Sequence, residues 1–156
     1  MPIATTASIP RYADRMGKAI PGQLYGDSDH IVLVKQAGED IAFGSPLFAK
    51  ANDAHVVVGK DSTKALAFVG IAGFTQQTAG CYEEDRPLNC VKVGFIYVKM
   101  TGSIKEGEAV YVKYADGSFV SETTKNAGTA ADFVAINGYA IEAGVDGDIV
   151  AIRIVE

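Results

Sequence analysis

The chain has 156 residues, of which 48% are hydrophobic and 21% charged, and its formal net charge is −5. These values suit one domain or two small fused halves with a buried core, and they exclude a wholly disordered chain. The acidic balance argues against nucleic-acid binding, and no apolar run approaches the roughly 20 residues that would cross a bilayer.

Residues 1–30 are predicted to form an extended arm, because prolines and glycines interrupt them and no helical or strand period survives. The first 18 residues carry three basic side chains against Asp14, a sum of +2 that leaves −7 for the remainder. This asymmetry favours an arm that contacts an acidic surface, and a solvated tail is the alternative. The segment lacks the apolar region of a secretory signal, so we expect the chain to fold in a cytoplasm.

Apolar, tyrosine and arginine side chains scattered along the arm are of the types enriched at protein interfaces. We predict that they contact a partner protein or another subunit. The predicted contact residues are Ile9, Arg11, Tyr12, Arg15, Met16, Ile20, Leu24 and Tyr25.

Residues 31–156 are predicted to form an all-β body, because short β-branched or aromatic runs alternate with Gly, Asp and Asn. Strands are expected at 31–35, 47–50, 55–59, 66–75, 91–100, 109–114, 118–121, 133–142 and 148–155. Alternation in the fifth run places Val91, Val93, Phe95, Tyr97 and Lys99 on one face. The last run places Arg153 outward. Asp116-Gly117 predicts a hairpin turn, and Asn52-Asp53 is expected to do the same. Helix is limited to one short turn within 124–132.

Residues of about 38–101 and 102–156 resemble two copies of one β unit. Ile41 matches Ile104, and Lys50 matches Lys113, when the segments are aligned without a gap. Four glycines fall at matching places and are predicted to be structural, namely Gly44 with Gly107 and, once a few inserted residues are allowed, Gly70 with Gly138. The second pair is expected in mid-strand, where a bulge or a close strand crossing excludes a side chain. Chance similarity between β-rich segments is the alternative.

Motifs of enzymatic chemistry are absent from the sequence: there is no GxSxG, no GxxxxGK[ST] and no HExxH. Two cysteines and two histidines lack the spacing of a structural zinc site. Cys81 and Cys90 could close a disulfide across a loop or remain free thiols. Trimeric dUTP hydrolases have a similar length, but the C-terminal AIRIVE lacks their basic, glycine-containing motif. We therefore expect no enzymatic activity, no cofactor and no metal.

A family resemblance is carried by short phrases along the chain. They are PGQLYG (21–26), GEDIAFGSPLFA (38–49), FVGIAGFT (68–75), GSIKEGEAVYV (102–112), DGSFV (116–120) and GDIVAIRIV (147–155). With the arm that precedes them, they resemble the structural cement proteins of tailed phages, which coat HK97-type heads. Residues 76–90 match no phrase of that family.

The resemblance implies a small β-barrel or jelly-roll-like body built from the two related units. It also implies a virion protein on the outer capsid surface that stabilises junctions between capsomers. Its partners would be the major capsid protein and further copies of itself, as a homotrimer or, second, a homodimer, with neither nucleic acid nor membrane. The alternatives are another virion β module, such as a tail or baseplate adaptor, and a small ligand-binding β-barrel.

Overall fold

The computed structural model describes residues 19–24, 30–76 and 80–155, and they form an all-β protein as the sequence predicts. The strands are β1 (Ile31–Ala37), β2 (Ile41–Ala42), β3 (Pro46–Lys50), β4 (Asp53–Val58), β5 (Ala67–Ala72), β6 (Cys81–Tyr82), β7 (Pro87–Lys99), β8 (Ala109–Lys113), β9 (Phe119–Ser121), β10 (Phe133–Ala140) and β11 (Ile149–Ile154). The helical segments described are α2 (Glu122–Asn126) and a 3₁₀ turn at Ala130–Asp132. The sequence did not predict β2, β6 or the first four residues of β7.

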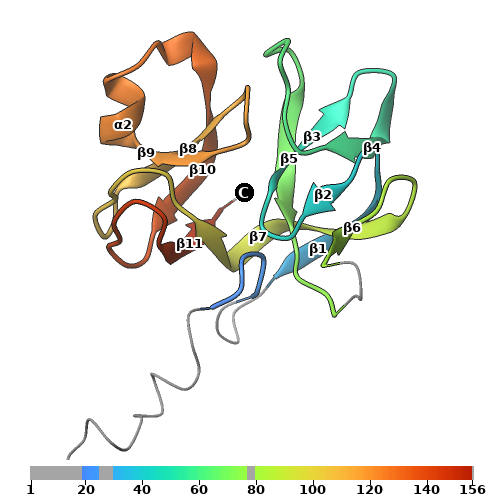
Figure 1. Ribbon diagram of the computed structural model, residues 1–156, viewed down its shortest axis with the longest axis horizontal. Helices are drawn as coiled ribbons and strands as arrows, with labels where there is room; N and C mark the ends of the chain where they lie inside the picture. Colours follow the sequence, from blue (N-terminus) through green and yellow to red (C-terminus); the bar gives the residue numbers. More distant parts are fainter. Residues whose placement is uncertain (1–18, 25–29, 77–79, 156) are drawn as a thin grey trace, which may run out of the picture.

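Five strands close a first barrel in the order β1-β4-β3-β5-β7, because β1 pairs with β4 on one side and with β7 on the other. The pairing of β1 with β7 is antiparallel and covers residues 31–36. The pairing of β1 with β4 is parallel and short, and it joins Gln36 to Val56 and Ala37 to Val57. Figure 1 shows this barrel at the right, with β7 at its base.

The second half of the chain extends the sheet from β7 through β11, β10, β8 and β9. A parallel bridge between Met100 and Phe119 returns the last strand to the end of β7, so these strands form a second barrel. The order β4-β3-β5-β7 in the first barrel therefore recurs as β9-β8-β10-β11 in the second. Figure 1 shows the two barrels side by side, with β7 passing from one to the other.

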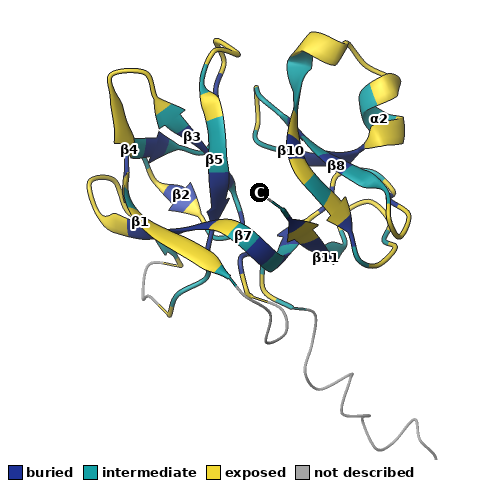
Figure 2. Cartoon of the chain, turned by 180° about the vertical axis from the view of Figure 1, so that it is seen from behind, coloured by how far each residue is buried: buried dark blue, intermediate teal, exposed yellow. Residues whose placement is uncertain are grey.

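Two apolar clusters fill the molecule. The first barrel encloses Ala37, Ile41, Leu47, Val57, Ala72, Tyr82, Leu88 and Cys90. The larger cluster fills the second barrel and continues to the first through Phe48, Ile71 and Val91. Figure 2 shows the buried residues on the inward parts of both barrels. Burying both sets of apolar side chains is the main force that favours this fold.

The loop after β4 also ties the barrels together. The Asp61 N–H donates to the Tyr114 carbonyl at 2.8 Å, and Lys64 forms an ion pair with Asp132. The buried Asp61 carboxylate accepts hydrogen bonds from the N–H and hydroxyl of Thr63 and from the N–H groups of Ala65 and Leu66. These bonds hold the loop in the shape that reaches the second barrel.

The residues that alternation places on one face of β7 form the more exposed face of that strand over most of its length. Val93, Phe95 and Tyr97 are half-buried and Lys99 is exposed, whereas Val91 is buried. A register shift opposite Val91 and Val93 explains the exception, because it changes the phase of the alternation. Arg153 in β11 is exposed, as expected.

Both predicted hairpins are present, with one difference in a turn. Gly117 lies in the loop between β8 and β9 with φ of +70°. In the first barrel Asp53 already pairs with Lys50, so Ala51 and Asn52 make the turn instead of Asn52 and Asp53. In the first turn the His55 N–H donates to the Oδ1 of Asp53 at 2.9 Å. In the second the Ser118 N–H donates to the Oδ1 of Asp116 at 3.0 Å.

Residues 19–24 lie against the body, although the sequence places them in the arm. The Gly22 N–H donates to the Tyr97 carbonyl at 2.7 Å, and the Tyr97 N–H donates to the Gln23 carbonyl at 2.9 Å. The Gly22 carbonyl accepts from the Phe74 N–H at 2.8 Å, and Leu24 bridges to Ile96. A turn that needs the positive φ of Gly22 allows this close approach to the strands. The residues that remain for an arm include 1–18.

Candidate interaction surface

Most of the predicted contact residues lie outside the part of the chain that the structure describes. These are Ile9, Arg11, Tyr12, Arg15, Met16 and Tyr25. Ile20 and Leu24 are described and are 44% and 41% exposed, and Leu24 bridges to Ile96 of β7. Both are therefore available to a partner, and the contact role of the whole set stays a prediction.

The first four residues of β1 carry exposed apolar side chains, which we call the β1 patch. Ile31, Val32 and Leu33 are 41–42% exposed, and Val34 is 68% exposed. A half-buried strand normally alternates apolar and polar residues, so exposure on both faces marks a stretch of β1 that neither apolar cluster covers. Figure 2 shows this stretch of β1 as exposed. The unbroken IVLV run is the sequence signal for this exposure, but the run by itself predicts only a strand over 31–35.

One edge of β1 is open at this patch. The Ala37 N–H donates to the Arg86 carbonyl, on the β7 side, and the Gly38 N–H donates to Val57, on the β4 side. Because backbone groups alternate along a strand, the N–H and C=O of Val34 and Val32 point away from β7. Pairing with β4 begins only at Gln36, so no described strand lies beside them. We call residues 32–34 on this side the open edge of β1.

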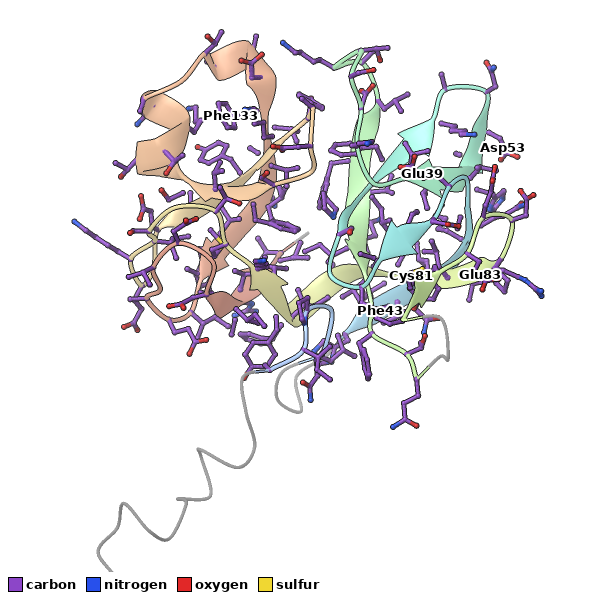
Figure 3. All side chains as sticks on the ribbon, in the orientation of Figure 1. Glu39, Phe43, Asp53, Cys81, Glu83 and Phe133 are labelled. Carbon is purple, nitrogen blue, oxygen red and sulfur yellow. The ribbon has the colours of Figure 1, made fainter. Side chains whose placement is uncertain are left out.

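A shallow hollow lies where β1 and β4 separate. It is lined by Val34, Lys35, Gln36, His55, Asp85 and Pro87. The Lys35 ammonium crosses the gap to the Ala54 carbonyl at 3.1 Å, and the Gln36 amide approaches the Asp85 carboxylate at 3.4 Å. Asp85 belongs to a turn with Glu83 and Glu84, so carboxylates border this end of the hollow. Figure 3 shows Glu83, Asp53 and Glu39 on the first barrel.

The four predicted structural glycines occupy two kinds of place. Gly44 and Gly107 have φ of +79° and +81°, each in a turn just before the strand that starts its unit. Gly70 lies in β5 opposite Leu47, and Gly138 lies in β10 opposite Val110, each beside a register shift. A strand order and glycine placement of this kind are what two copies of one β unit would produce.

Chemically reactive groups are not gathered at any described place. No group of three or more His, Cys, Asp or Glu side chains among the described residues could hold a metal ion. Cys81 and Cys90 are free thiols, and burial raises the pKa of Cys90 to about 11 against the opposing charges of Lys35 and Lys92. No helix in the described parts of the chain is long and apolar enough to cross a membrane.

The Asp61 carboxylate is a structural group. Burial raises its pKa, but hydrogen bonds from the Thr63 hydroxyl and from the N–H groups of Leu66, Thr63 and Ala65 outweigh that effect, so its pKa lies below the usual value. Each carboxylate oxygen accepts two of these bonds. The group therefore serves the loop that joins the barrels.

Comparisons with known proteins point in one direction. A family model described as "Structural cement protein (E217 gp24/Pam3 gp6)" matches residues 9–155. No curated protein matches the chain. A solved structure from the capsid of Myoviridae phage XM1 is similar with a TM-score of 0.70 and 17% identity, and the match covers 87% of this chain and 89% of that one. The N base of the head fiber gp8.5 of bacteriophage phi29 is similar with a TM-score of 0.52 and 15% identity, covering 81% and 95%.

Proposed function

Because the chain belongs to the phage structural cement protein family, we propose that it is a head cement protein that binds the outer surface of an HK97-type capsid and stabilises the junctions between capsomers. The observation that carries this proposal is the family match over residues 9–155, which takes in both barrels. The similarity to a phage capsid chain over most of both lengths supports the fold on which the proposal depends.

The construction of the molecule suits a protein that acts by binding. Two barrels share β7 and are also joined by the Asp61 loop. The predicted arm and the β1 patch offer apolar and charged groups to partners. Exposed contiguous apolar side chains are characteristic of protein interaction sites. The proposed role requires no catalytic group.

We expect the protein to act as a homotrimer or, second, as a homodimer. When several weak contacts are linked through one oligomer, forming the first contact raises the effective concentration for forming the others. A small protein can therefore bind a capsid junction tightly. The partners in this proposal are the major capsid protein and further copies of the chain, and the host cytoplasm is the place of synthesis.

Two other functions make different demands on the structure. A tail or baseplate adaptor would assemble into rings without affinity for heads. A ligand-binding barrel would need an enclosed interior site with polar groups, whereas side chains such as Leu47 and Tyr82 fill the first barrel and Ile152 and Val112 fill the second. The packing therefore favours a structural role over ligand binding.

The function is tested with heads that lack this protein. Purified protein is added to such heads, and the temperature at which they rupture and release DNA is measured. The proposal expects a higher rupture temperature that saturates as junction sites fill. An unchanged rupture temperature with the protein demonstrably bound would contradict the stabilising role.

A further inference from the structure

We infer that the open edge of β1 receives residues 3–9 of a neighbouring copy as an added strand, which runs parallel to β1 when the protein assembles. The inference rests on the proposed function, because that function brings several copies of the chain together on one head. It assigns a partner to the β1 patch and a binding mode to the arm. Strand addition of this kind combines main-chain hydrogen bonds with side-chain contacts on both faces.

The acceptor is an edge beside which the described structure places no strand, and the Lys35 side chain that crosses the gap to the Ala54 carbonyl would have to move aside for an added strand. The backbone groups of Val32 and Val34 face outward beside the hollow. Proteins usually protect such an edge with charges, prolines or a covering segment, because it pairs readily with another chain. Here the side chains at the edge are Ile31, Val32, Leu33 and Val34, all apolar and all exposed. An added strand would satisfy the backbone and cover the patch together.

The donor is the one stretch of the arm with the character of a strand. Residues 3–9 read IATTASI, seven residues without charge, and Pro2 and Pro10 bound them. Ile3 and Ile9 share one face of an extended chain with Thr5 and Ala7. β-branched residues favour strands, and the flanking prolines limit the pairing to this stretch.

Charge sets the direction of the added strand. Arg11 and Arg15 follow the donor stretch in the sequence. In a parallel arrangement they come after the strand at the Gln36 end of β1, where Asp85 lines the hollow and Glu83 lies in the same turn. An antiparallel arrangement would carry them away from these carboxylates. Arginine pairs strongly with carboxylates, so the parallel direction is favoured.

The length of the linker between Ile9 and Ala19 favours another copy as the donor. The described chain starts at Ala19, close to where Gln23 bonds Tyr97, whereas the hollow lies near Leu88, the partner of Lys35. Nine residues of β7 separate these two places, about 30 Å in a strand. Ten residue steps from Ile9 to Ala19 span at most about 33–36 Å when fully extended. A chain could pair with its own β1 in this direction only by holding that linker almost straight across a curved barrel.

The test uses full-length chains with single introduced cysteines in a Cys81→Ser background. Chains with Thr6→Cys carry a size tag and are mixed with untagged chains with Val34→Cys, either on heads or at concentrations where sedimentation shows oligomers. Mild oxidation is followed by non-reducing electrophoresis. The matched control replaces Val34→Cys with Val145→Cys, which is also an exposed apolar position, 61% exposed, but lies on the second barrel.

The inference expects a tagged–untagged crosslink severalfold stronger for Val34→Cys than for Val145→Cys, and weaker when the tagged chain also carries Arg11→Glu. A crosslink no stronger than the control overturns it, as does a chain with both cysteines that forms only an internal bridge. A protein that never oligomerises, free or on heads, also overturns it. Head binding of the same variants is measured separately. Intact head binding without the crosslink rejects strand exchange alone, and a crosslink without head binding rejects the proposed function alone.

Discussion

Gly70 and Gly138 occupy matching positions in the two barrels, and in each case the next strand leaves no room for a side chain. A Cβ on Gly70 would lie 2.7 Å from the Val91 carbonyl oxygen in β7. A Cβ on Gly138 would lie 2.7 Å from the Arg153 carbonyl oxygen in β11. At both places a side chain would clash with a backbone carbonyl of the neighbouring strand, so glycine is favoured there for one physical reason.

Gly70→Ala and Gly138→Ala should each lower the free energy of unfolding by about 1–3 kcal/mol, because strands must shift to admit the methyl group. Gly59→Ala is the control, since its Cβ would meet no atom closer than 3.8 Å. Urea denaturation measures all three. A Gly138→Ala variant as stable as Gly59→Ala would show that the close crossing in β10 is not needed.

Asp61→Asn should destabilise the protein by about 2 kcal/mol, because one oxygen that accepts two N–H or O–H groups becomes an NH₂ group. For a chain of this size that corresponds to a melting temperature lower by about 4–8 °C. Asp116→Asn is the matched control, because its Oδ1 alone accepts from the N–H and hydroxyl of Ser118, and Asn keeps such an oxygen. Equal melting temperatures for the two variants would contradict the role given to Asp61.

Asp61 also makes the free energy of unfolding depend on pH. Its pKa in the folded protein is below the ordinary 3.8, so the carboxylate stabilises the fold above that value. The contribution is lost as the pH falls through the folded-state pKa. The stability difference between the wild type and Asp61→Asn should therefore shrink on acidification below 3.8, as measured by urea denaturation at each pH. A difference that stays constant to the acid limit would contradict this assignment.

The two cysteines should react differently with a thiol reagent. Cys90 is buried and its pKa is raised to about 11, so little thiolate forms at neutral or mildly alkaline pH, whereas Cys81 is partly exposed. We expect one fast-reacting thiol in the folded chain and two after denaturation. Cys81→Ser should abolish the fast reaction, and fast labelling that persists in that variant would contradict the buried position of Cys90.

Truncation should separate the arm from the body at Lys18. Removing residues 1–18 should leave the melting temperature unchanged and weaken binding to heads, because the predicted contact residues Arg11 and Tyr12 are lost. Removing residues 1–24 should also lower the melting temperature, because Gly22 and Gln23 bond to β7 and to Phe74. Calorimetry and a head-binding assay compare the two. Undiminished head binding by the shorter truncation would make the arm a passive tail.

Local patterns in the sequence were sufficient for much of this fold. Alternation predicted β7 and the Asp116-Gly117 pair predicted a hairpin, and both are present. The matching glycines predicted two related units, which stays a prediction, and the two barrels have the same strand order. The sequence could not show that β7 serves both barrels, since a shared strand depends on pairings far apart in the chain. It also could not show the open edge of β1, because an exposed IVLV run and a buried one have the same letters. The docking of Gly22 depends on strand ends that no local pattern reveals.

The position of the protein on phage heads tests most directly the proposal that this chain binds them from the outside. A density map of heads with and without added protein should show extra density of the size of two small barrels on the outer surface, over junctions between capsomers. Heads without such density at saturating protein, or density on tails instead, would contradict the account.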